Sequence, residues 1–137
     1  MKILLIEDNA ILAHASLNSA NEAGIYCIRH CCSTEQALAV NADSPVRFNV
    51  ALLKYAGDIQ TDLRHMQALH RQGKTRSIVL VGNYDPEEKA ILQNAARAQA
   101  LPLLAMLDLP LSSGHLRNLL RTANDASSIA LSGRMDR

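Results

Sequence analysis

The sequence is poor in aromatic residues and contains no tryptophan. Its aromatic side chains are Tyr26, Phe48, Tyr55 and Tyr84, and none of them stands in a cluster of basic residues. Proteins that bind single-stranded nucleic acid stack bases on exposed aromatic rings beside basic groups. The 14 basic and 13 acidic residues also give a formal net charge of only +1. We therefore expect neither nucleic acid nor an anionic membrane as a partner.

Long hydrophobic runs and a disulfide framework are also missing. The first apolar run, residues 2–6, is followed at once by two acidic residues and is too short for a signal peptide or a membrane span. Cys27, Cys31 and Cys32 are odd in number and stand close together, which argues against structural disulfides. These features predict a protein of a reducing compartment, the cytoplasm.

The cysteines do not form a recognisable metal site either. Together with His30 they have the spacing C-x₂-H-C-C, and the sequence offers no second pair of zinc ligands. We expect Cys27 to be a buried strand residue, and Cys31 and Cys32 to be small residues at the start of a helix. No metal ion and no cofactor are predicted.

What the sequence does contain is a regular alternation of short apolar runs and longer mixed segments. Apolar residues make up 48% of the chain, enough for a core. Five repeats of the alternation predict an α/β fold, in which helices cover both faces of a parallel sheet. The predicted strands are residues 2–6, 25–29, 48–53, 77–81 and 102–107. Right-handed crossovers favour the flavodoxin-like strand order 2-1-3-4-5.

Local signals support this division. Asn9 is a good N-cap for the first helix, and Asp85 with Glu88 three residues later marks the start of the fourth. We expect a loop over residues 54–60 and a helix from residue 61 or 62. Pro102 favours an edge position for the fifth strand, because proline cannot donate to a strand ladder.

The chain length fits one domain. We expect that domain over residues 1–123. The small and polar residues 124–137 predict a linker or a disordered tail.

The fold predicts where chemistry would occur. In open parallel sheets ligands bind at the carboxyl ends of the strands, where the strand order reverses. Glu7 and Asp8 end the first strand, Lys54 ends the third, Gly82 ends the fourth, and residues 107–110 end the fifth. Because the first and third strands are neighbours, we predict an ion pair between Lys54 and Glu7 or Asp8.

Three segments resemble the receiver domains of two-component signalling. They are LLIEDN after the first strand, FNVALL in the third, and LPLLAMLDLPLSS around the fifth. The resemblance covers residues 1–122 and implies the (βα)₅ receiver fold. It also implies that Glu7 and Asp8 fill the position of the acidic pair that holds Mg²⁺ in receivers.

The other positions of the receiver pocket differ. Lys54 stands where a receiver has its phosphoacceptor aspartate, Gly82 where it has a hydroxyl residue, and Leu109 where it has a phosphate-binding lysine. Met106 takes the place of the switch aromatic. An ammonium group cannot form an acyl phosphate, so the resemblance implies a pseudo-receiver, a regulatory domain and not an enzyme.

The segment LPLLAMLDLPLSSGHLRNLL is also similar to receivers that precede EAL-type cyclic-di-GMP phosphodiesterase domains. No EAL motif occurs in this chain. The resemblance implies a protein partner or a covalently linked output domain. It also implies a possible homodimer through the fourth helix, fifth strand and fifth helix, here residues 89–97, 103–107 and 116–122.

Two alternatives stay open on the sequence alone. In one, the domain senses a small ligand in the vacated acidic pocket, where Gly82 and Leu109 leave room. In the other, it is an atypical phosphorylatable receiver, for which Asp58 is the candidate acceptor. Asp58 lies four residues past Lys54, about 10 Å along an extended chain, which favours an ordinary polar loop residue.

Overall fold

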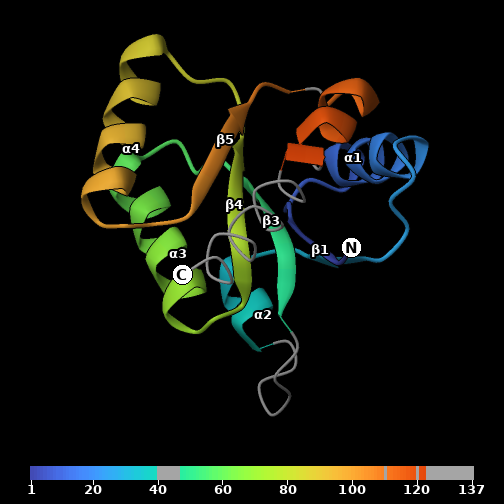
Figure 1. The fold of residues 1–137 in the computed structure, drawn as a ribbon, viewed down its shortest axis with the longest axis horizontal. Coiled ribbons are helices and arrows are strands. Elements are labelled where there is room, and N and C mark those ends of the chain that lie inside the picture. The colour runs from blue at the N-terminus through green and yellow to red at the C-terminus, as the bar shows by residue number, and fades with distance from the viewer. Residues whose placement is uncertain (40–46, 110, 120, 123–137) are drawn as a thin grey trace, which may run out of the picture.

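The fold is a five-stranded sheet between two layers of helices (Figure 1). The computed structural model describes residues 1–39, 47–109, 111–119 and 121–122. All strand pairs are parallel, and the order is β2-β1-β3-β4-β5, which confirms the predicted flavodoxin-like topology. The strands are β1 (Ile3–Ile6), β2 (Ile28–Cys31), β3 (Phe48–Lys54), β4 (Thr75–Val81) and β5 (Leu103–Leu107).

The helices divide between the two faces of the sheet. They are α1 (Ala10–Glu22), α2 (Thr34–Ala39), α3 (Ile59–Arg71) and α4 (Pro86–Ala98), and residues 113–119 and 121–122 are also helical. One core cluster joins the sheet to α2, α3 and α4. The other joins it to α1 and to the last helical segment through residues such as Leu116. In Figure 1, α1 and that last segment lie together on the opposite side of the sheet from α3 and α4.

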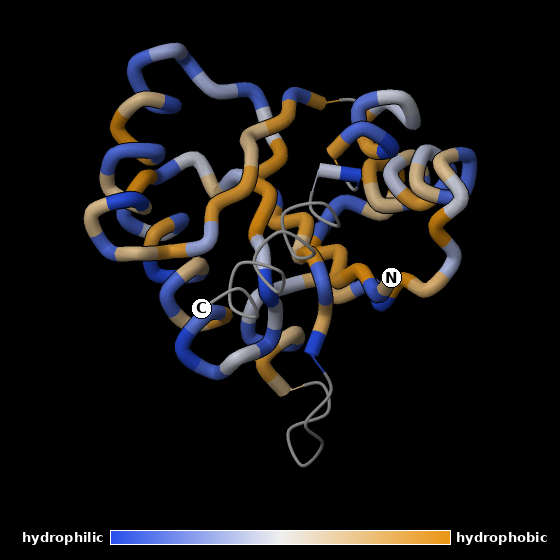
Figure 2. The backbone as a smooth tube through the Cα atoms, viewed as in Figure 1, coloured by the Kyte–Doolittle hydropathy of each residue, from blue (hydrophilic) through white to orange (hydrophobic). Residues whose placement is uncertain are grey.

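The central strands are buried on both faces. Every residue of β1 is at most 4% exposed, and the hydrophobic colour in Figure 2 follows the strands through the middle of the molecule. This explains why the first strand has no polar alternation in its sequence. β5 is an edge strand, as Pro102 predicted, and all five of its residues are only half-buried.

The predicted helix starts at Asn9 and Asp85 are confirmed. Asn9 Oδ1 accepts hydrogen bonds from the backbone N–H groups of Ile11 and Leu12, both at 3.0 Å. Asp85 begins a capping box in which its own backbone N–H donates to Glu88 Oε1 at 3.2 Å. These contacts satisfy backbone N–H groups that have no partner within the helix.

The second strand differs from the prediction. It begins at Ile28 and extends to Cys31, where residues 25–29 were expected. The parallel register pairs Ile3 with Ile28 and Ile6 with Cys31, so the strand is displaced toward its carboxyl end. Cys31 is therefore buried and Cys27 is exposed, the reverse of the prediction.

The third helix also begins earlier than predicted. It begins at Ile59, and Asp58 caps it by accepting a hydrogen bond from the Thr61 backbone N–H at 3.2 Å. This start places Asp62 in the first turn, where the residue is 0% exposed. β3 in turn includes Lys54, which was expected to begin a loop.

The predicted linker, residues 124–137, lies outside the described part of the chain. Within the part that is described, no helix combines the length and the apolar character needed to cross a bilayer.

Candidate functional site

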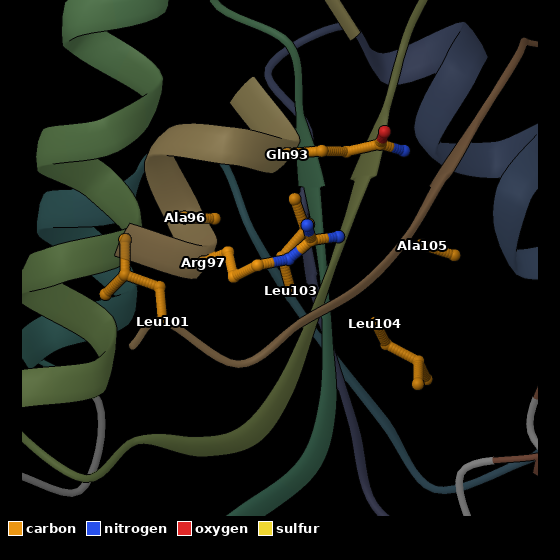
Figure 3. Close-up of a pocket in the computed structure, with 7 residues that line it drawn as sticks. All are labelled: Gln93, Ala96, Arg97, Leu101, Leu103, Leu104 and Ala105. Carbon is orange, nitrogen blue, oxygen red and sulfur yellow. The ribbon is translucent and has the colours of Figure 1, made fainter. Parts of the chain in front are cut away.

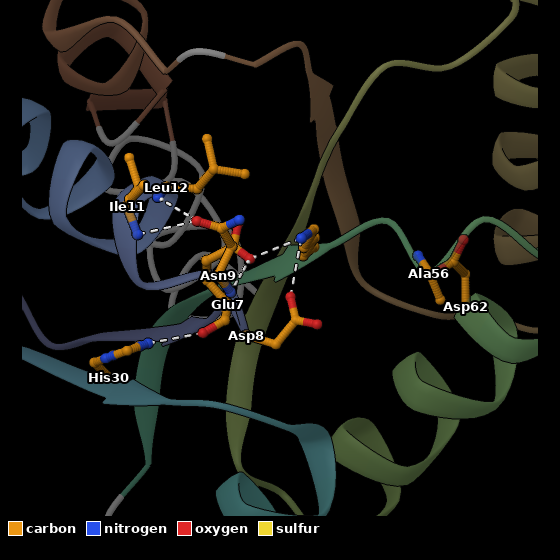
Figure 4. Close-up of polar contacts among 9 residues, drawn as sticks. Glu7, Asp8, Asn9, Ile11, Leu12, His30, Ala56 and Asp62 are labelled. Carbon is orange, nitrogen blue, oxygen red and sulfur yellow. Dashed lines mark hydrogen bonds and ion pairs between the residues drawn. The ribbon is translucent and has the colours of Figure 1, made fainter.

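The carboxyl ends of β1 and β3 bring together an acidic pair and a lysine. β1 and β3 pair in parallel with Ile6 opposite Leu53, so the residues that follow them emerge side by side. Lys54 Nζ lies 3.0 Å from Glu7 Oε2 and 2.9 Å from Asp8 Oδ1 (Figure 4). The predicted ion pair is present, and it involves both carboxylates.

The two carboxylates differ in burial. The Glu7 side chain is 4% exposed, whereas that of Asp8 is 72% exposed and that of Lys54 is 33% exposed. Glu7 Oε2 also accepts a hydrogen bond from the Asn9 backbone N–H at 3.0 Å. Glu7 is therefore the inner partner, held by both a lysine and a helix start, and Asp8 is the outer one.

The pairing changes the titration of the lysine and of the outer carboxylate. The hydrogen bond to Asp8, followed by the one to Glu7, raises the pKa of Lys54. The hydrogen bond from Lys54 is in turn the largest cause that lowers the pKa of Asp8. Both shifts favour the charged forms, so the pairing stabilises the ammonium of Lys54 and the carboxylate of Asp8.

This arrangement does not fit the Mg²⁺ that the receiver resemblance implies. A hard divalent cation needs several oxygen ligands, and the third position here carries an ammonium group that has no lone pair. Among residues 1–39, 47–109, 111–119 and 121–122, no group of three His, Cys, Asp or Glu side chains is placed to hold a metal ion. The lysine already cancels part of the charge of the acidic pair and occupies the third position, so no reaction step through a metal follows from this site.

Gly82 is buried against a side chain that sequence reasoning missed. A Cβ atom on Gly82 would lie 2.6 Å from Tyr55 Cβ, closer than real Cβ contacts allow. The space that a hydroxyl residue needs at the end of β4 is thus filled by the residue that follows Lys54. The expectation that Gly82 leaves room for a ligand is therefore wrong.

Leu109 and Met106 belong to the core instead of the pocket. Leu109 packs against the core cluster on the α1 side of the sheet, and Met106 packs against the cluster on the α3 and α4 side. Asp108 is exposed, with its Oδ1 atom 3.6 Å from Lys89 Nζ. Asp58, the candidate alternative acceptor, is the exposed N-cap of α3.

A cluster of two tyrosines and two carboxylates lies beside the lysine site. The rings of Tyr55 and Tyr84 are 4.1 Å apart between centroids, at an angle of 41°. The Tyr55 hydroxyl donates a hydrogen bond to Glu88 Oε2, and this bond raises the pKa of Tyr55 to about 12. The sequence did hold a signal for this cluster. Two of the four aromatic residues, Tyr55 and Tyr84, follow the ends of neighbouring strands, and such positions bring side chains together.

Asp62 is the most deeply buried acidic group described. Its Oδ1 atom accepts a hydrogen bond from the Ala56 backbone N–H at 2.9 Å (Figure 4), and its Oδ2 atom has no partner among the described residues. Burial raises the pKa of Asp62 to about 6, the N–H of Ala56 opposes this, and the charges of Asp58 and Glu88 add to it.

A hollow of about 390 Å³ opens on the α2 and α3 side of the lysine. It is lined by Ile6, Asp8, Cys32, Ser33, Thr34, Glu35, Leu53, Lys54, Tyr55, Ala56 and His65. Neither Gly82 nor Leu109 contributes to it. Thr34 Oγ1 and His65 Nδ1 are buried in its walls without a hydrogen-bond partner in the described part of the chain.

Comparisons with known proteins find a likeness in structure but not in sequence. No family model matches the chain, and no curated protein matches it. A response regulator from Thermotoga maritima matches with a TM-score of 0.71 at 9% identity, over 89% of this chain and 95% of that one. The chemotaxis protein CheY4 of Vibrio cholerae matches with a TM-score of 0.66 at 19% identity, over 89% and 97%.

A third similar structure is part of a larger protein. It is the N-terminal domain of a response regulator/sensory box/GGDEF three-domain protein from Carboxydothermus hydrogenoformans, with a TM-score of 0.68 at 16% identity. The match covers 96% of this chain and 99% of that domain. At such identities a likeness shows the fold alone, and the fold of this chain is that of the response-regulator receiver domains.

Proposed function

We propose that this chain is a regulatory module of two-component signalling that works without phosphorylation. The observation that carries the proposal is the position of Lys54, whose Nζ atom lies within 3.0 Å of both Glu7 and Asp8. An ammonium group at the end of β3 offers no oxygen for an acyl phosphate. The module is thus a pseudo-receiver, and we do not assign it an enzymatic activity.

The lysine replaces the electrostatic role of a metal ion. Two adjacent carboxylates repel each other, and in a partly buried site one of them would tend to stay protonated. Lys54 cancels part of that charge from the neighbouring strand. Phosphate would therefore meet a site whose only cation within the described residues is already paired with both carboxylates, and which has lost its phosphate-binding groups at Gly82 and Leu109.

The most direct test is chemical labelling. The protein is incubated with acetyl phosphate and Mg²⁺, and its intact mass is recorded beside that of a receiver that retains its aspartate. We expect no phosphoryl adduct on this chain under conditions that label the control. A stoichiometric adduct, at Asp58 or elsewhere, would overturn the proposal.

A module without chemistry must act by contact, and the α4–β5 side offers a surface for it. A hollow of about 390 Å³ lies there between Gln93, Ala96, Arg97, Leu101, Leu103, Leu104 and Ala105 (Figure 3). Its lining combines leucines with a single cation. We propose that this side binds a protein partner, a linked output domain or a second copy of the chain.

A covalently linked output domain has support from one similar structure. The Carboxydothermus hydrogenoformans domain is the N-terminal part of a protein that also has sensory box and GGDEF domains. We propose a comparable arrangement here, with an output in cyclic-di-GMP-type signalling.

The unpaired state of Cys27, Cys31 and Cys32 supports a cytoplasmic location.

Light scattering tests self-association through the α4–β5 side. A stable interface should bury more than about 1,000 Å² in total. We expect Leu103→Arg and Arg97→Glu to weaken a dimer, and Asn18→Arg, on the exposed side of α1, to leave it intact. A monomeric wild-type chain that includes its output domain would argue against the homodimer.

A second candidate function is small-ligand sensing, and the hollow beside Lys54 favours it. Thr34 is 4% exposed, and its Oγ1 atom has no partner among the described residues. A polar ligand that entered this hollow could satisfy Thr34 and His65 after small side-chain rotations. Thermal shift with a panel of small polar metabolites tests this, with Thr34→Val as the matched control. A shift that persists in Thr34→Val would place binding elsewhere.

A further inference from the structure

Asp62 lies at the junction between the loop that follows Lys54 and the first turn of α4. We propose that protonation of Asp62 is an input to this domain, and that loss of the proton loosens the contact between this loop and α4. The inference rests on the proposed function, because a receiver fold without an acceptor needs another input. In this inference the input is the binding or loss of a proton at Asp62, a residue that takes no part in the ion pair of Lys54.

The geometry leaves Asp62 without the partners that a buried charge needs. The residue is 0% exposed, and the only hydrogen bond to its side chain within the described chain comes from the Ala56 N–H at 2.9 Å. Oδ2 has no partner among the described residues. A protonated carboxyl is neutral and can donate a hydrogen bond, whereas a carboxylate here would be a buried charge with one donor.

The charged groups around Asp62 further destabilise its ionised form. Asp58, the N-cap of the same helix, and Glu88 of α4 both act on it as negative charges. Tyr84, from the connection before α4, has a buried hydroxyl that is unpartnered within the described residues. Tyr55, from the loop after β3, has its hydroxyl committed to Glu88.

The nearby cations do not compensate. The ammonium of Lys54 is held by Glu7 and Asp8. Arg64 of the same helix donates from its guanidinium to Thr61 Oγ1 at 3.2 Å. His65 lies one turn further along α3, so the experiment includes a His65 variant to separate the two residues.

The pH window follows from the burial of Asp62. Burial and its acidic neighbours raise the pKa of Asp62 from 3.8 to about 6. The carboxyl is therefore neutral in the folded protein below this pH and charged above it.

Glu88 carries the response to α4. One of its oxygens accepts the Tyr55 hydroxyl, and the other accepts the Asp85 backbone N–H at 3.2 Å, which caps α4. A charge on Asp62 repels Glu88 and weakens both contacts. The first turn of α4 and the loop after β3 then separate, and α4 is one wall of the α4–β5 hollow in Figure 3.

Tyrosine fluorescence and near-UV circular dichroism can follow this change. The chain has three tyrosines and no tryptophan. Tyr55 and Tyr84 are in the cluster beside the lysine site, whereas Tyr26 is 78% exposed. The substitution Tyr26→Phe therefore removes the only tyrosine signal that comes from outside the cluster. The pKa values of Tyr55 and Tyr84 are both raised above 10, so a signal change between pH 5 and pH 7.5 cannot come from their own ionisation.

We expect a one-proton transition with a midpoint near pH 6 in the Tyr26→Phe protein. Asp62→Asn, which keeps the oxygen that accepts from Ala56, should abolish it. His65→Gln should leave it in place. Should Asp62→Asn fail to fold, Glu88→Gln provides the second variant, because removing that charge should move the midpoint downward.

Carboxyl-carbon NMR on the wild-type protein reads Asp62 directly. An Asp62 that titrates near its ordinary value of 3.8, or a transition that persists in Asp62→Asn, would overturn the inference. The two proposals fail separately. A phosphoryl adduct would remove the phosphorylation-independent function and leave the Asp62 titration standing, whereas a missing titration would leave the labelling result unchanged.

Discussion

Two acidic regions contact neighbouring residues at the end of β3, Lys54 and Ala56, and the two regions stabilise opposite protonation states. At the ends of β1 and β3, Glu7 and Asp8 share an ammonium group within 3.0 Å. At the start of α3, Asp62 is fully buried, accepts one N–H, and is acted on by two further negative charges. The carboxylates of the first region have a counter-ion and are partly exposed, whereas Asp62 in the second region has no counter-ion among the described residues and is buried.

The difference shows how the environment decides the protonation state of chemically similar groups. The lysine keeps Asp8 ionised to lower pH than usual, because it favours the charged form. Burial keeps Asp62 neutral to higher pH than usual, because it disfavours the charged form. Tyr55 lies between Lys54 and Ala56 in the sequence, and its hydroxyl donates a hydrogen bond to Glu88, one of the two charges that act on Asp62.

The largest expected effect is on stability at neutral pH when Asp62 is replaced by Asn. In the folded state the pKa of Asp62 is raised to about 6. Its stabilising effect is complete below the unfolded pKa and is lost as the pH rises through the folded value, by up to about 3 kcal/mol. Urea unfolding should therefore show Asp62→Asn equal to wild type at pH 4 and more stable at pH 7.5.

Asp58→Asn is the matched control for this measurement, because asparagine caps a helix about as well as aspartate. Asp58 is exposed, and its charge is one of the two that raise the pKa of Asp62. Its substitution should therefore change stability at pH 7.5 far less than Asp62→Asn does. Equal stability of wild type and Asp62→Asn across the whole range would mean that Asp62 is hydrated, and the contrast between the two regions would disappear.

The next largest effect concerns the contact between Gly82 and Tyr55. A Cβ atom on Gly82 meets Tyr55 Cβ at 2.6 Å, so Gly82→Ser should destabilise the fold by about 1–3 kcal/mol through overpacking. Tyr55→Gly in the same chain removes the Cβ atom that the new side chain meets and should remove much of that penalty, whereas Tyr55→Ala, which keeps this atom, should not. A double-mutant cycle on urea midpoints measures the coupling. Additive effects would show that Tyr55 does not fill this space.

The sequence predicted the sheet and the lysine contact for the same physical reason. Unalternated apolar runs mark buried parallel strands, and right-handed crossovers leave few strand orders. The neighbouring positions of the first and third strands then bring Lys54 to Glu7 and Asp8, whatever the details of the loops. Features fixed by topology are readable without coordinates.

The sequence did not reveal features that depend on a choice between equivalent local signals. Asp58, Thr61 and Asp62 are all good N-caps, and only the structure shows that the first of them caps α3 and the last is buried. Residues 25–31 likewise contain apolar positions for more than one strand register. The prediction therefore placed Cys27 in the buried strand, where the structure has Cys31. The contact between Tyr55 and Gly82 joins two loops, and no local pattern predicts it.

An effect of similar or smaller size is expected from Lys54→Ala. It leaves Glu7 buried and without its counter-ion, but Lys54 is 33% exposed, so water can replace part of the interaction. We expect a loss of about 1–3 kcal/mol in the free energy of unfolding. The freed acidic pair should also gain some affinity for Mg²⁺, which would raise the urea midpoint of the variant only.

Lys54→Met controls for the loss of the aliphatic stem, because it keeps most of the packing and removes the charge. Both variants should lose similar stability if the ion pair is responsible. A variant as stable as wild type, with no response to Mg²⁺, would show that Lys54 is merely a surface residue.

The smallest effect, from Asp8→Asn, completes the contrast with Asp62. The pKa of Asp8 is lowered by its hydrogen bond with Lys54, so its contribution is present above the unfolded value and is lost as the pH falls through the folded one. Asp8 is 72% exposed, and exposed pairs contribute about 0.2–1 kcal/mol. Asp8→Asn should therefore be slightly less stable than wild type at pH 7.5 and equal to it at pH 3, in low salt. This dependence is opposite in sign to that of Asp62→Asn, so two substitutions of the same chemical kind should change the pH profile in opposite directions. If both variants changed it in the same direction, the lysine would not hold Asp8 in its charged form.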